Sequence, residues 1–346
     1  QLVKEGSEVK VLTTKHHPKL RAREVIEGAE VIRIRTLNRY LFTLTAIFKA
    51  YRLSRWCDII HTTSYNAALP AYIAARLRRK PAVITFHEVW GKLWFKLPWM
   101  PRWQKWLHFR FEKRILKLNF DRFIAVSDYT ANCLKVSGIG EQMVQRIYNG
   151  LDYGKMNQLL NTTACDPGFD SPDFVYYGRA GISKGINLII EAAATLKDEG
   201  QHPLIYLILP EKPRKNLKKI AGSINKLKVD DIIQVLPSQP REKLNIILRN
   251  AGSVLIPSYS EGFCFVATEC AAMGIPLITS GKGALKETVS GKYITMKEHT
   301  SAGLAGAMKE AMEGKWEITG MKKFNIDTQT QEYIRVYNSL LQTDQA

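Results

Sequence analysis

Short apolar runs alternate with segments of helical periodicity along almost the whole chain. The runs that predict strands are 9–14, 29–34, 58–63, 82–87 and 123–127, followed after a break by 173–178, 204–209, 232–237, 253–258 and 276–280. Helical patterns lie between them, for example over 67–79, 187–199, 242–249 and 266–273. Strands that alternate with helices form βα units, which assemble into parallel sheets with helices on both faces. The pattern therefore predicts an α/β fold.

The strand series is interrupted near residue 150, where YNGLDYGKM contains a turn-forming Asn-Gly pair and a second glycine. At 346 residues the chain is long enough for two domains with cores of their own. We predict two doubly wound, Rossmann-like domains facing a cleft, 1–149 and 150–326. A C-terminal helix over 327–346 is expected to pack back toward the first domain, and a polar loop over 161–173 to lead into the second.

Positive charge is concentrated in the first half of the chain. The net charge is +18, and residues 1–150 contain 27 Lys and Arg against 11 Asp and Glu, whereas residues 151–346 contain 23 against 21. This asymmetry predicts that the first half faces an anionic partner, such as nucleic acid, anionic lipid or a phosphorylated substrate. The alternative is a basic surface that is only solvated.

No apolar run approaches the roughly 18 residues that read as a membrane-spanning helix. The five cysteines, at 57, 133, 165, 264 and 270, show neither pairwise spacing nor a CxxC motif. We therefore expect reduced thiols and a cytoplasmic setting.

The segment PSYSEGFCFVATECAAMGIPLITS, residues 257–280, carries two glutamates with seven residues between them. A strand ends, a loop presents Glu261, and a helix is expected to begin near Phe263. The free N–H groups at such a helix start bind anions. Glu269, about two turns into the helix, is suited to accept hydrogen bonds from two vicinal hydroxyls. The alternative is a solvent-facing Glu261 and a surface Glu269.

The segment YYGRAGISKG, residues 176–185, follows another predicted strand. Arg179 and Lys184 lie there among three glycines, which allow close backbone approach. Two cations in such a loop suit a diphosphate. A solvated loop that merely bends the chain has the same composition.

With TFHE (85–88), AVSDYT (125–130) and YNGLD (148–152), these two segments resemble the retaining glycosyltransferases of family four, which have the GT-B fold. The resemblance extends over nearly the whole chain. It implies catalytic roles for four residues: His87, near the reacting centre; Arg179 and Lys184, on the donor diphosphate; and Glu261, on the transferred sugar.

The resemblance also implies how the rest of the donor is bound. Glu269 would bind the ribose, and Ser238 and Gln239 would lie beside the base. The backbone N–H groups that help on sugar and phosphate would come from Gly262, Phe263, Cys264, Phe265 and Val266. The donor would be a nucleotide sugar, with UDP expected before GDP or ADP, and the reaction would use neither a metal nor another cofactor.

The chain departs from the family pattern at two places. Cys264 stands where the family usually has glycine, and its bulk is expected to affect donor choice or turnover. A reactive thiol is one alternative, and a plain small hydrophobe is another. The family's first strand and glycine-rich loop would precede Gln1, so we expect the natural protein to continue upstream.

Five of the seven tryptophans lie in residues 90–111. Residues 90–117 also hold eight Lys and Arg against one acid, Glu112. The prolines predict a loop up to Pro101 and a helix after it. One helix face, expected to join the core, contains Trp103, Leu107, Phe111, Ile115 and Leu118.

Aromatic rings interleaved with cations are typical of an element that lies at a membrane interface. The residues predicted to contact the membrane are Trp90, Lys92, Trp94, Lys96, Trp99, Arg102, Lys105, Trp106 and Phe109. In the alternative, Trp90, Trp94 and Trp99 pack under a long loop. Nucleic acid also binds aromatics and cations, but it is not the expected partner.

The sequence as a whole predicts a peripheral enzyme at the cytoplasmic face of the membrane, which moves a sugar from a nucleotide sugar to a lipid or lipid-linked acceptor. Two alternatives stay open: a transferase acting on a soluble acceptor, and a noncatalytic GT-B-like protein that binds anionic lipid or nucleic acid.

Overall fold

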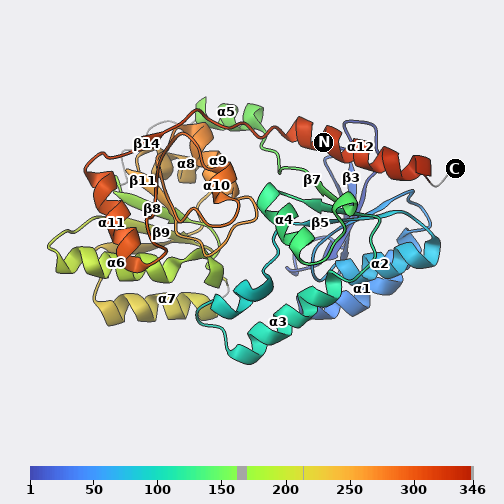
Figure 1. Ribbon diagram of the computed structural model, residues 1–346, viewed down its shortest axis with the longest axis horizontal. Helices are drawn as coiled ribbons and strands as arrows, with labels where there is room; N and C mark the ends of the chain where they lie inside the picture. Colours follow the sequence, from blue (N-terminus) through green and yellow to red (C-terminus); the bar gives the residue numbers. More distant parts are fainter. Residues whose placement is uncertain (162–169, 213, 344–346) are drawn as a thin grey trace. The chain divides into compact units, whose positions relative to one another are not determined.

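The computed structural model describes residues 1–161, 170–212 and 214–343, which form two compact units (Figure 1). Unit 1 comprises Gln1–Phe95, Arg102–Gly150 and Asn325–Ala346, and unit 2 comprises Lys96–Pro101 and Leu151–Phe324. Cys165 and residues 162–169 of the predicted polar loop lie outside the described residues.

Unit 2 is built on a seven-stranded sheet with the order β10-β9-β8-β11-β12-β13-β14. Neighbouring strands are parallel except β13 and β14. The first six follow the strand order of a Rossmann fold, in which the order reverses beside the first strand. The strands are β8 (Phe174–Tyr177), β9 (Ile205–Leu209), β10 (Ile233–Pro237), β11 (Ser253–Ile256), β12 (Leu277–Thr279), β13 (Lys292–Thr295) and β14 (Glu317–Ile318).

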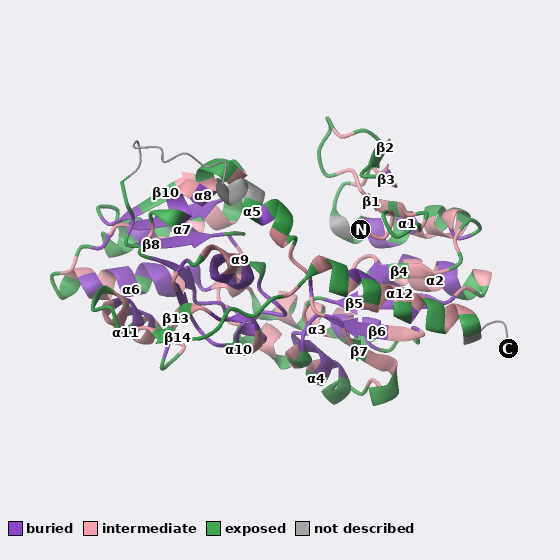
Figure 2. Ribbon diagram, turned by 90° about the horizontal axis from the view of Figure 1, so that it is seen from above, coloured by how far each residue is buried: buried purple, intermediate pink, exposed green. Residues whose placement is uncertain are grey.

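Helices cover both faces of this sheet, because its central strands are apolar on both sides. Every residue of β8, β9, β11 and β12 is buried, as expected of central parallel strands (Figure 2). One core cluster contains residues of α6 (Ile186–Asp198), α7 (Arg214–Leu227) and α11 (Ser301–Met312). The other contains residues of α8 (Arg241–Arg249), α9 (Phe265–Met273) and α10 (Leu285–Thr288). Helix α5 (Tyr153–Asn161) begins the unit's main segment.

The strands of unit 1 form two sheets. A three-stranded sheet has the order β1-β3-β2, with β1 (Lys10–Thr14) parallel to β3 (Ala29–Ile34) and β2 (Arg23–Ile26) antiparallel to it. A four-stranded parallel sheet contains β4 (Ile60–Thr63), β5 (Ala82–Phe86), β6 (Arg122–Ala125) and β7 (Val144–Arg146) in sequence order.

The four-stranded sheet is also covered on both faces. Its core on one face includes residues of α2 (Ala68–Arg78), α3 (Arg102–Ile115) and α4 (Asp128–Val136). On the other face, Val336 of α12 (Ile326–Thr343) packs with Val83, Ile124 and Ile147. Helix α1 (Arg39–Leu53) lies against α2.

The predicted fold class, α/β with two doubly wound Rossmann-like domains, is confirmed by this architecture. All ten predicted strands are present, whereas the short strands β2, β7, β13 and β14 were not predicted. No helix in the described part of the chain is long and apolar enough to cross a membrane.

The loop after β8 approaches the loop after β11 so closely that only glycine fits at residue 185. Gly185 has φ +72°, and a Cβ there would lie 2.0 Å from the carbonyl oxygen of Pro257.

Gly274 offers a matched comparison, because it has φ +70° with nothing within 4 Å of its Cβ position. We expect Gly274→Ala to lower the free energy of unfolding by about 1 kcal/mol, because alanine is strained at positive φ. Gly185→Ala should lower it by at least about 2 kcal/mol more, because its Cβ would also clash with the Pro257 carbonyl. Urea unfolding of both variants tests this, and equal losses would contradict it.

Candidate functional site

The strand order of unit 2 reverses between β8 and β11, which is where open α/β sheets bind ligands beyond the carboxyl ends of their strands. The two loops that leave these strands pack against each other. The backbone N–H of Tyr259, after β11, donates to the carbonyl of Ser183, after β8, at 2.8 Å. Together with the Gly185 contact, this fixes the two loops at one edge of the sheet.

Glu261 is the centre of a buried polar cluster at this edge. It is 7% exposed, and its Oε1 lies 2.7 Å from Nζ of Lys184. The hydroxyl of Ser258 donates to the same oxygen at 2.6 Å. The predicted loop residues Lys184 and Glu261, 77 positions apart in sequence, are therefore in direct contact.

The backbone holds Glu261 as firmly as its side chain does. The N–H of Ala284 donates to the carbonyl of Glu261 at 2.8 Å. Gly283, with φ +64°, passes so close that a Cβ there would lie 2.4 Å from this carbonyl oxygen. A carboxylate and a cation held in fixed positions need no reorganisation when charge develops on a ligand.

Arg179 lies on the same loop as Lys184, and its side chain is exposed. The loop around it is anchored by the hydroxyl of Tyr176, which donates to the carbonyl of Arg179 at 2.8 Å, and by the Asn216 amide, which donates to the carbonyl of Ala180 at 2.5 Å. Burial raises the pKa of Tyr176 well above its ordinary value, so this hydroxyl stays a donor. The loop backbone is thus fixed, while the charged side chain of Arg179 is exposed to solvent.

Glu269 is oriented by two residues that the sequence did not single out. Its Oε2 accepts a hydrogen bond from the hydroxyl of Tyr177 at 3.1 Å and pairs with Arg241 at 3.0 Å. Tyr177 ends β8, and Arg241 begins α8. The sequence shows that Arg241 is a charged residue at the start of a predicted helix. No sequence spacing, however, links Arg241 to Glu269. Ser258 was also missed, although it lies three residues before Glu261.

The residues predicted beside the base follow β10. Ser238 is exposed, and the Gln239 amide donates to the carbonyl of Pro237 at 2.8 Å. Because β10 is parallel to β9 and β8, this loop lies at the same edge of the sheet as Lys184 and Glu261.

Helix α9 begins at Phe265, two residues later than predicted, with Cys264 as its N-cap. Gly262 and Phe263 are buried before it, Phe265 is exposed and Val266 is half-buried. Cys264 has φ +78°, the left-handed region that favours glycine. A backbone requirement therefore explains why glycine would suit this position.

The thiol of Cys264 is buried in the apolar cluster that also contains Cys270 and Ala267. Burial raises the pKa of the Cys264 thiol far above its ordinary value, and that of Cys270 to about 12. The thiolate is the nucleophilic form. This environment favours the interpretation of Cys264 as a small hydrophobe over a reactive thiol.

His87 belongs to unit 1, where it follows β5 directly. Its side chain reaches the surface, yet desolvation by the surrounding protein lowers the pKa of the imidazole. The neutral ring is favoured at neutral pH, in which one nitrogen can accept and the other donate. The other predicted catalytic residues belong to unit 2.

The tryptophan stretch differs from the predicted membrane-contacting set. Trp90 is 7% exposed, so the prediction that it contacts a membrane is wrong. Trp94 stacks on His108 with ring centroids 4.8 Å apart, and Trp99 packs against the core of unit 2. For these three the alternative interpretation, packing under a loop, describes the structure. Of the remaining six, Lys92, Lys96, Arg102 and Trp106 are exposed, and Lys105 and Phe109 are half-buried.

The predicted core face of α3 is also wrong in its first half. Trp103 is 64% exposed and Leu107 is exposed, whereas Glu112 and Ile115 are buried. Aromatic residues occur on both sides of this part of the helix, so periodicity does not define one apolar stripe. The rotation of the helix places Glu112 inward, where its carboxylate receives several hydrogen bonds.

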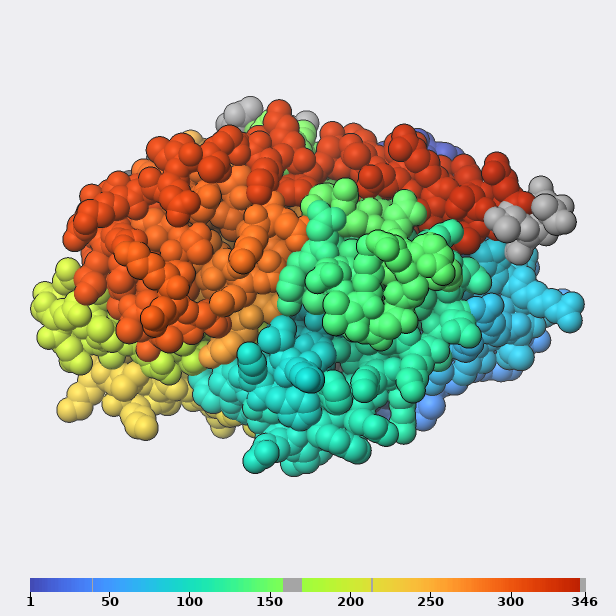
Figure 3. All heavy atoms as spheres, in the orientation of Figure 1, coloured from blue at the N-terminus to red at the C-terminus, as the bar shows by residue number. Residues whose placement is uncertain are grey.

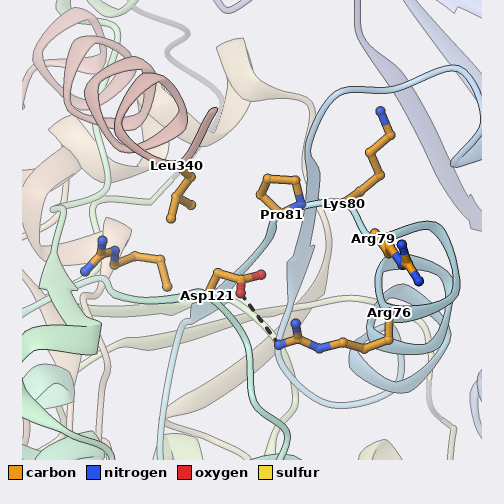
Figure 4. Close-up of a pocket in the computed structure, with 7 residues that line it drawn as sticks. Arg76, Arg79, Lys80, Pro81, Asp121 and Leu340 are labelled. Atoms are coloured by element: carbon orange, nitrogen blue, oxygen red, sulfur yellow. Dashed lines mark ion pairs between the residues drawn. The ribbon is translucent and has the colours of Figure 1, made fainter. Parts of the chain in front are cut away.

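A hollow of about 430 Å³ in unit 1 is lined mainly by cations (Figure 4). Arg76 pairs with Asp121 at 3.6 Å, while Arg79 and Lys80 point away from Asp121. Cations that diverge do not form a phosphate cradle. Within the described ranges, no three His, Cys, Asp or Glu side chains gather as a metal site would require.

Comparisons with known proteins match both halves of the chain. Residues 1–155 match the family model Glycosyltransferase Family 4, and residues 168–326 match Glycosyl transferases group 1. A D-inositol 3-phosphate glycosyltransferase of Nocardia farcinica is 31% identical over 40% of the chain, and a glycogen synthase of Mycobacterium tuberculosis is 23% identical over 74%. The matches span only 32% and 60% of these relatives' own length.

Solved structures show the same fold. A sucrose-phosphate synthase from Thermosynechococcus elongatus superposes with a TM-score of 0.72 at 21% identity, covering 99% of this chain and 91% of that one. HepE of Anabaena in complex with UDP and glucose gives 0.68 at 18% identity, covering 90% and 86%. The predicted GT-B fold is confirmed by these neighbours.

The thiol environments lead to a prediction about alkylation. In the native protein at pH 8 we expect iodoacetamide to modify the half-buried Cys57 and Cys133 before Cys264 and Cys270, because burial both shields the latter two and keeps them protonated. Peptide mass spectrometry over a time course measures this, with urea-unfolded protein as the control in which all four react. Modification of Cys264 as fast as Cys57 would contradict it.

Proposed function

The chain belongs to glycosyltransferase family 4, and from this membership we propose that it transfers a sugar from a nucleotide sugar to an acceptor hydroxyl, with retention of anomeric configuration. The observation that carries the proposal is the buried cluster of Lys184, Glu261 and Ser258 at the reversal of strand order in unit 2. This cluster puts a cation and a carboxylate where a Rossmann fold binds its nucleotide.

In the proposed reaction, the bond between the sugar's anomeric carbon and the diphosphate breaks, and a bond to the acceptor oxygen forms. Negative charge develops on the leaving diphosphate, where Lys184 and the exposed Arg179 stabilise it. Glu261 accepts hydrogen bonds from hydroxyls of the transferred sugar, and Glu269, oriented by Tyr177, does so from the ribose. The acceptor's proton passes to the leaving phosphate oxygen. No step of this scheme requires a metal.

We take UDP as the first nucleotide to test, because HepE, a neighbour in fold, binds UDP. Ser238 and Gln239 are the proposed contacts of the base. Cys264 is the N-cap of α9, the helix start at which the transferred sugar would lie, and its side chain packs in the apolar cluster with Cys270. We therefore propose that Cys264 affects which sugar is accepted.

The acceptor is proposed to be a lipid or a lipid-linked sugar, because unit 1 exposes an aromatic and basic surface. In α3, Trp103, Trp106 and Leu107 are exposed, and the guanidinium of Arg110 lies 5.6 Å from the Trp106 ring (Figure 3 shows α3 at the surface). Exposed apolar side chains of this kind, interleaved with cations, suit the headgroup level of an anionic bilayer.

Helix α1 extends the same surface. Leu44 and Phe48 are exposed on α1 with Tyr40 one turn before them, and the Tyr40 ring lies 6.4 Å from His108 of α3. The guanidinium of Arg52 lies 5.8 Å from the Phe48 ring. Exposed apolar residues on two neighbouring helices favour docking on a bilayer over simple solvation. The proposed location is the cytoplasmic face of a membrane, with peripheral attachment.

A second candidate is transfer to a soluble acceptor. The names of the D-inositol 3-phosphate glycosyltransferase and of the sucrose-phosphate synthase point to small phosphorylated acceptors in those proteins. The basic charge of the first half of the chain would suit such an acceptor as well as a lipid headgroup.

Removal of the Glu261 carboxylate tests the proposed activity. The protein is offered UDP-, GDP- and ADP-sugars with and without a lipid extract, and release of free nucleotide is followed. We expect release that needs one donor and the lipid, and Glu261→Gln should lower its rate by about a hundredfold or more, because the charge at the sugar is lost. Release with inositol phosphate or sugar phosphate in place of lipid would favour the soluble acceptor.

The matched control is Glu199→Gln, which removes a carboxylate that pairs with Lys309 at the surface of unit 2. This variant should keep the wild-type rate. If wild-type protein binds a nucleotide sugar by calorimetry but releases no nucleotide with any acceptor, it is a binding protein and the proposed activity is wrong.

The membrane surface leads to a separate prediction. We expect Trp103→Ser with Trp106→Ser to weaken sedimentation with liposomes that contain anionic lipid by about a hundredfold or more, since two buried rings at roughly 1.5–3 kcal/mol each contribute at least about 3 kcal/mol. The control is Val136→Ser, which removes an apolar side chain that is 80% exposed on α4. Equal binding of the double variant and the wild type, or no binding by either, would contradict the membrane proposal.

A further inference from the structure

The most deeply buried carboxylate in the first unit's core lies in the tryptophan stretch. Glu112 of α3 is 1% exposed. Its carboxylate accepts hydrogen bonds from the backbone N–H of Trp90 at 3.0 Å, the backbone N–H of Gly91 at 2.6 Å, the indole N–H of Trp94 at 3.1 Å and the hydroxyl of Tyr65 at 2.9 Å. No lysine or arginine of the described chain forms an ion pair with it.

A buried carboxylate without a cation is stable only when hydrogen bonds replace the water it has lost. Four donors on its two oxygens do this, and bonds to a charged acceptor are stronger than those between neutral groups. An apolar residue would fill the same space but would leave two backbone N–H groups and an indole N–H buried without partners. The buried carboxylate therefore fixes the positions of its hydrogen-bond donors, which apolar packing alone would not do.

The geometry that Glu112 specifies is that of the loop after β5. His87 begins this loop, and Trp90 and Gly91 follow three and four residues later. The hydroxyl of Tyr65, which follows β4, also lies 3.1 Å from the carbonyl of Glu88. Trp94 is held twice, by Glu112 and by its stack on His108. One carboxylate thus joins the segments that follow two neighbouring strands of the sheet.

These segments lie at the carboxyl ends of β4 and β5, the edge at which a parallel sheet binds ligands. The donor residues proposed above all belong to unit 2, which leaves this edge of unit 1 for the acceptor. We propose that Glu112 is a positioning residue for acceptor binding: it fixes the 87–94 loop, with His87 at its start, as one wall of the acceptor site. This inference rests on the proposed transferase function.

Replacement of Glu112 by glutamine keeps the side chain's shape but turns one acceptor oxygen into a donor that faces the N–H groups. We expect Glu112→Gln to raise the KM for the acceptor by about tenfold or more, because a loop displaced by an ångström binds poorly. The KM for the nucleotide sugar should stay within twofold. Binding of the nucleotide sugar without acceptor, measured by calorimetry, should also remain, since the proposed donor residues belong to the other unit.

Milder variants keep the test valid if Glu112→Gln folds poorly. Trp94→Phe retains a ring to stack on His108 but removes its N–H, and Tyr65→Phe removes only the hydroxyl that reaches Glu112. Each should raise the acceptor KM by a few fold. The matched control is Glu141→Gln, an exposed carboxylate of unit 1 that pairs with Lys135, and it should change neither KM.

The readouts separate a positioning role from a purely structural one. A variant that only destabilises the fold lowers the fraction of active protein, so kcat falls while both KM values stay constant. That result in all three variants, or wild-type behaviour in all three, overturns the inference while the transferase function stands. A wild-type protein that transfers no sugar overturns the proposed function, and this inference with it.

Discussion

The ion pair between Lys184 and Glu261 is the interaction on which the ligand edge of unit 2 depends. It joins the loops after β8 and β11, the two strands between which the sheet order reverses. A buried pair contributes little net stability, because desolvation offsets much of the attraction. Loss of one partner is nevertheless costly, because it leaves the other charge buried and unpaired. The close passages at Gly185 and Gly283 leave the loops few other conformations. Charge and backbone sterics together preorganise the site before any ligand binds.

The strands and the candidate site residues Lys184 and Glu261 could be predicted from the sequence because both depend on local pattern. Apolar runs identify buried strands, and the glutamates at 261 and 269 lie on one continuous motif. Arg241 and Tyr177 escaped prediction because their contacts with Glu269 join the start of α8 and the end of β8 to the middle of α9. The orientation of α3 escaped it for another reason: the helix is apolar on two sides, and hydrogen bonds to Glu112, not hydrophobicity, select the buried one.

The tryptophans of residues 90–106 therefore serve more than one purpose. Trp90 and Trp94 belong to the packing around Glu112, and Trp99 covers apolar residues of unit 2. Trp103 and Trp106 are exposed among cations. The tryptophans that the sequence grouped into a single membrane element thus lie in three different environments: a core, a loop anchor and an exposed surface. A shared residue type did not imply a shared environment.

Helix α12 completes the core of the first unit. Val336, Tyr333 and Leu340 of α12 cover one face of a sheet whose strands lie between residues 60 and 146. During synthesis this apolar face has no cover until α12 has left the ribosome, by which time every strand of unit 2 has already emerged. Unit 2 can therefore complete its core before unit 1 does. Until α12 has packed, unit 1 exposes an apolar sheet face, the kind of surface that chaperones bind.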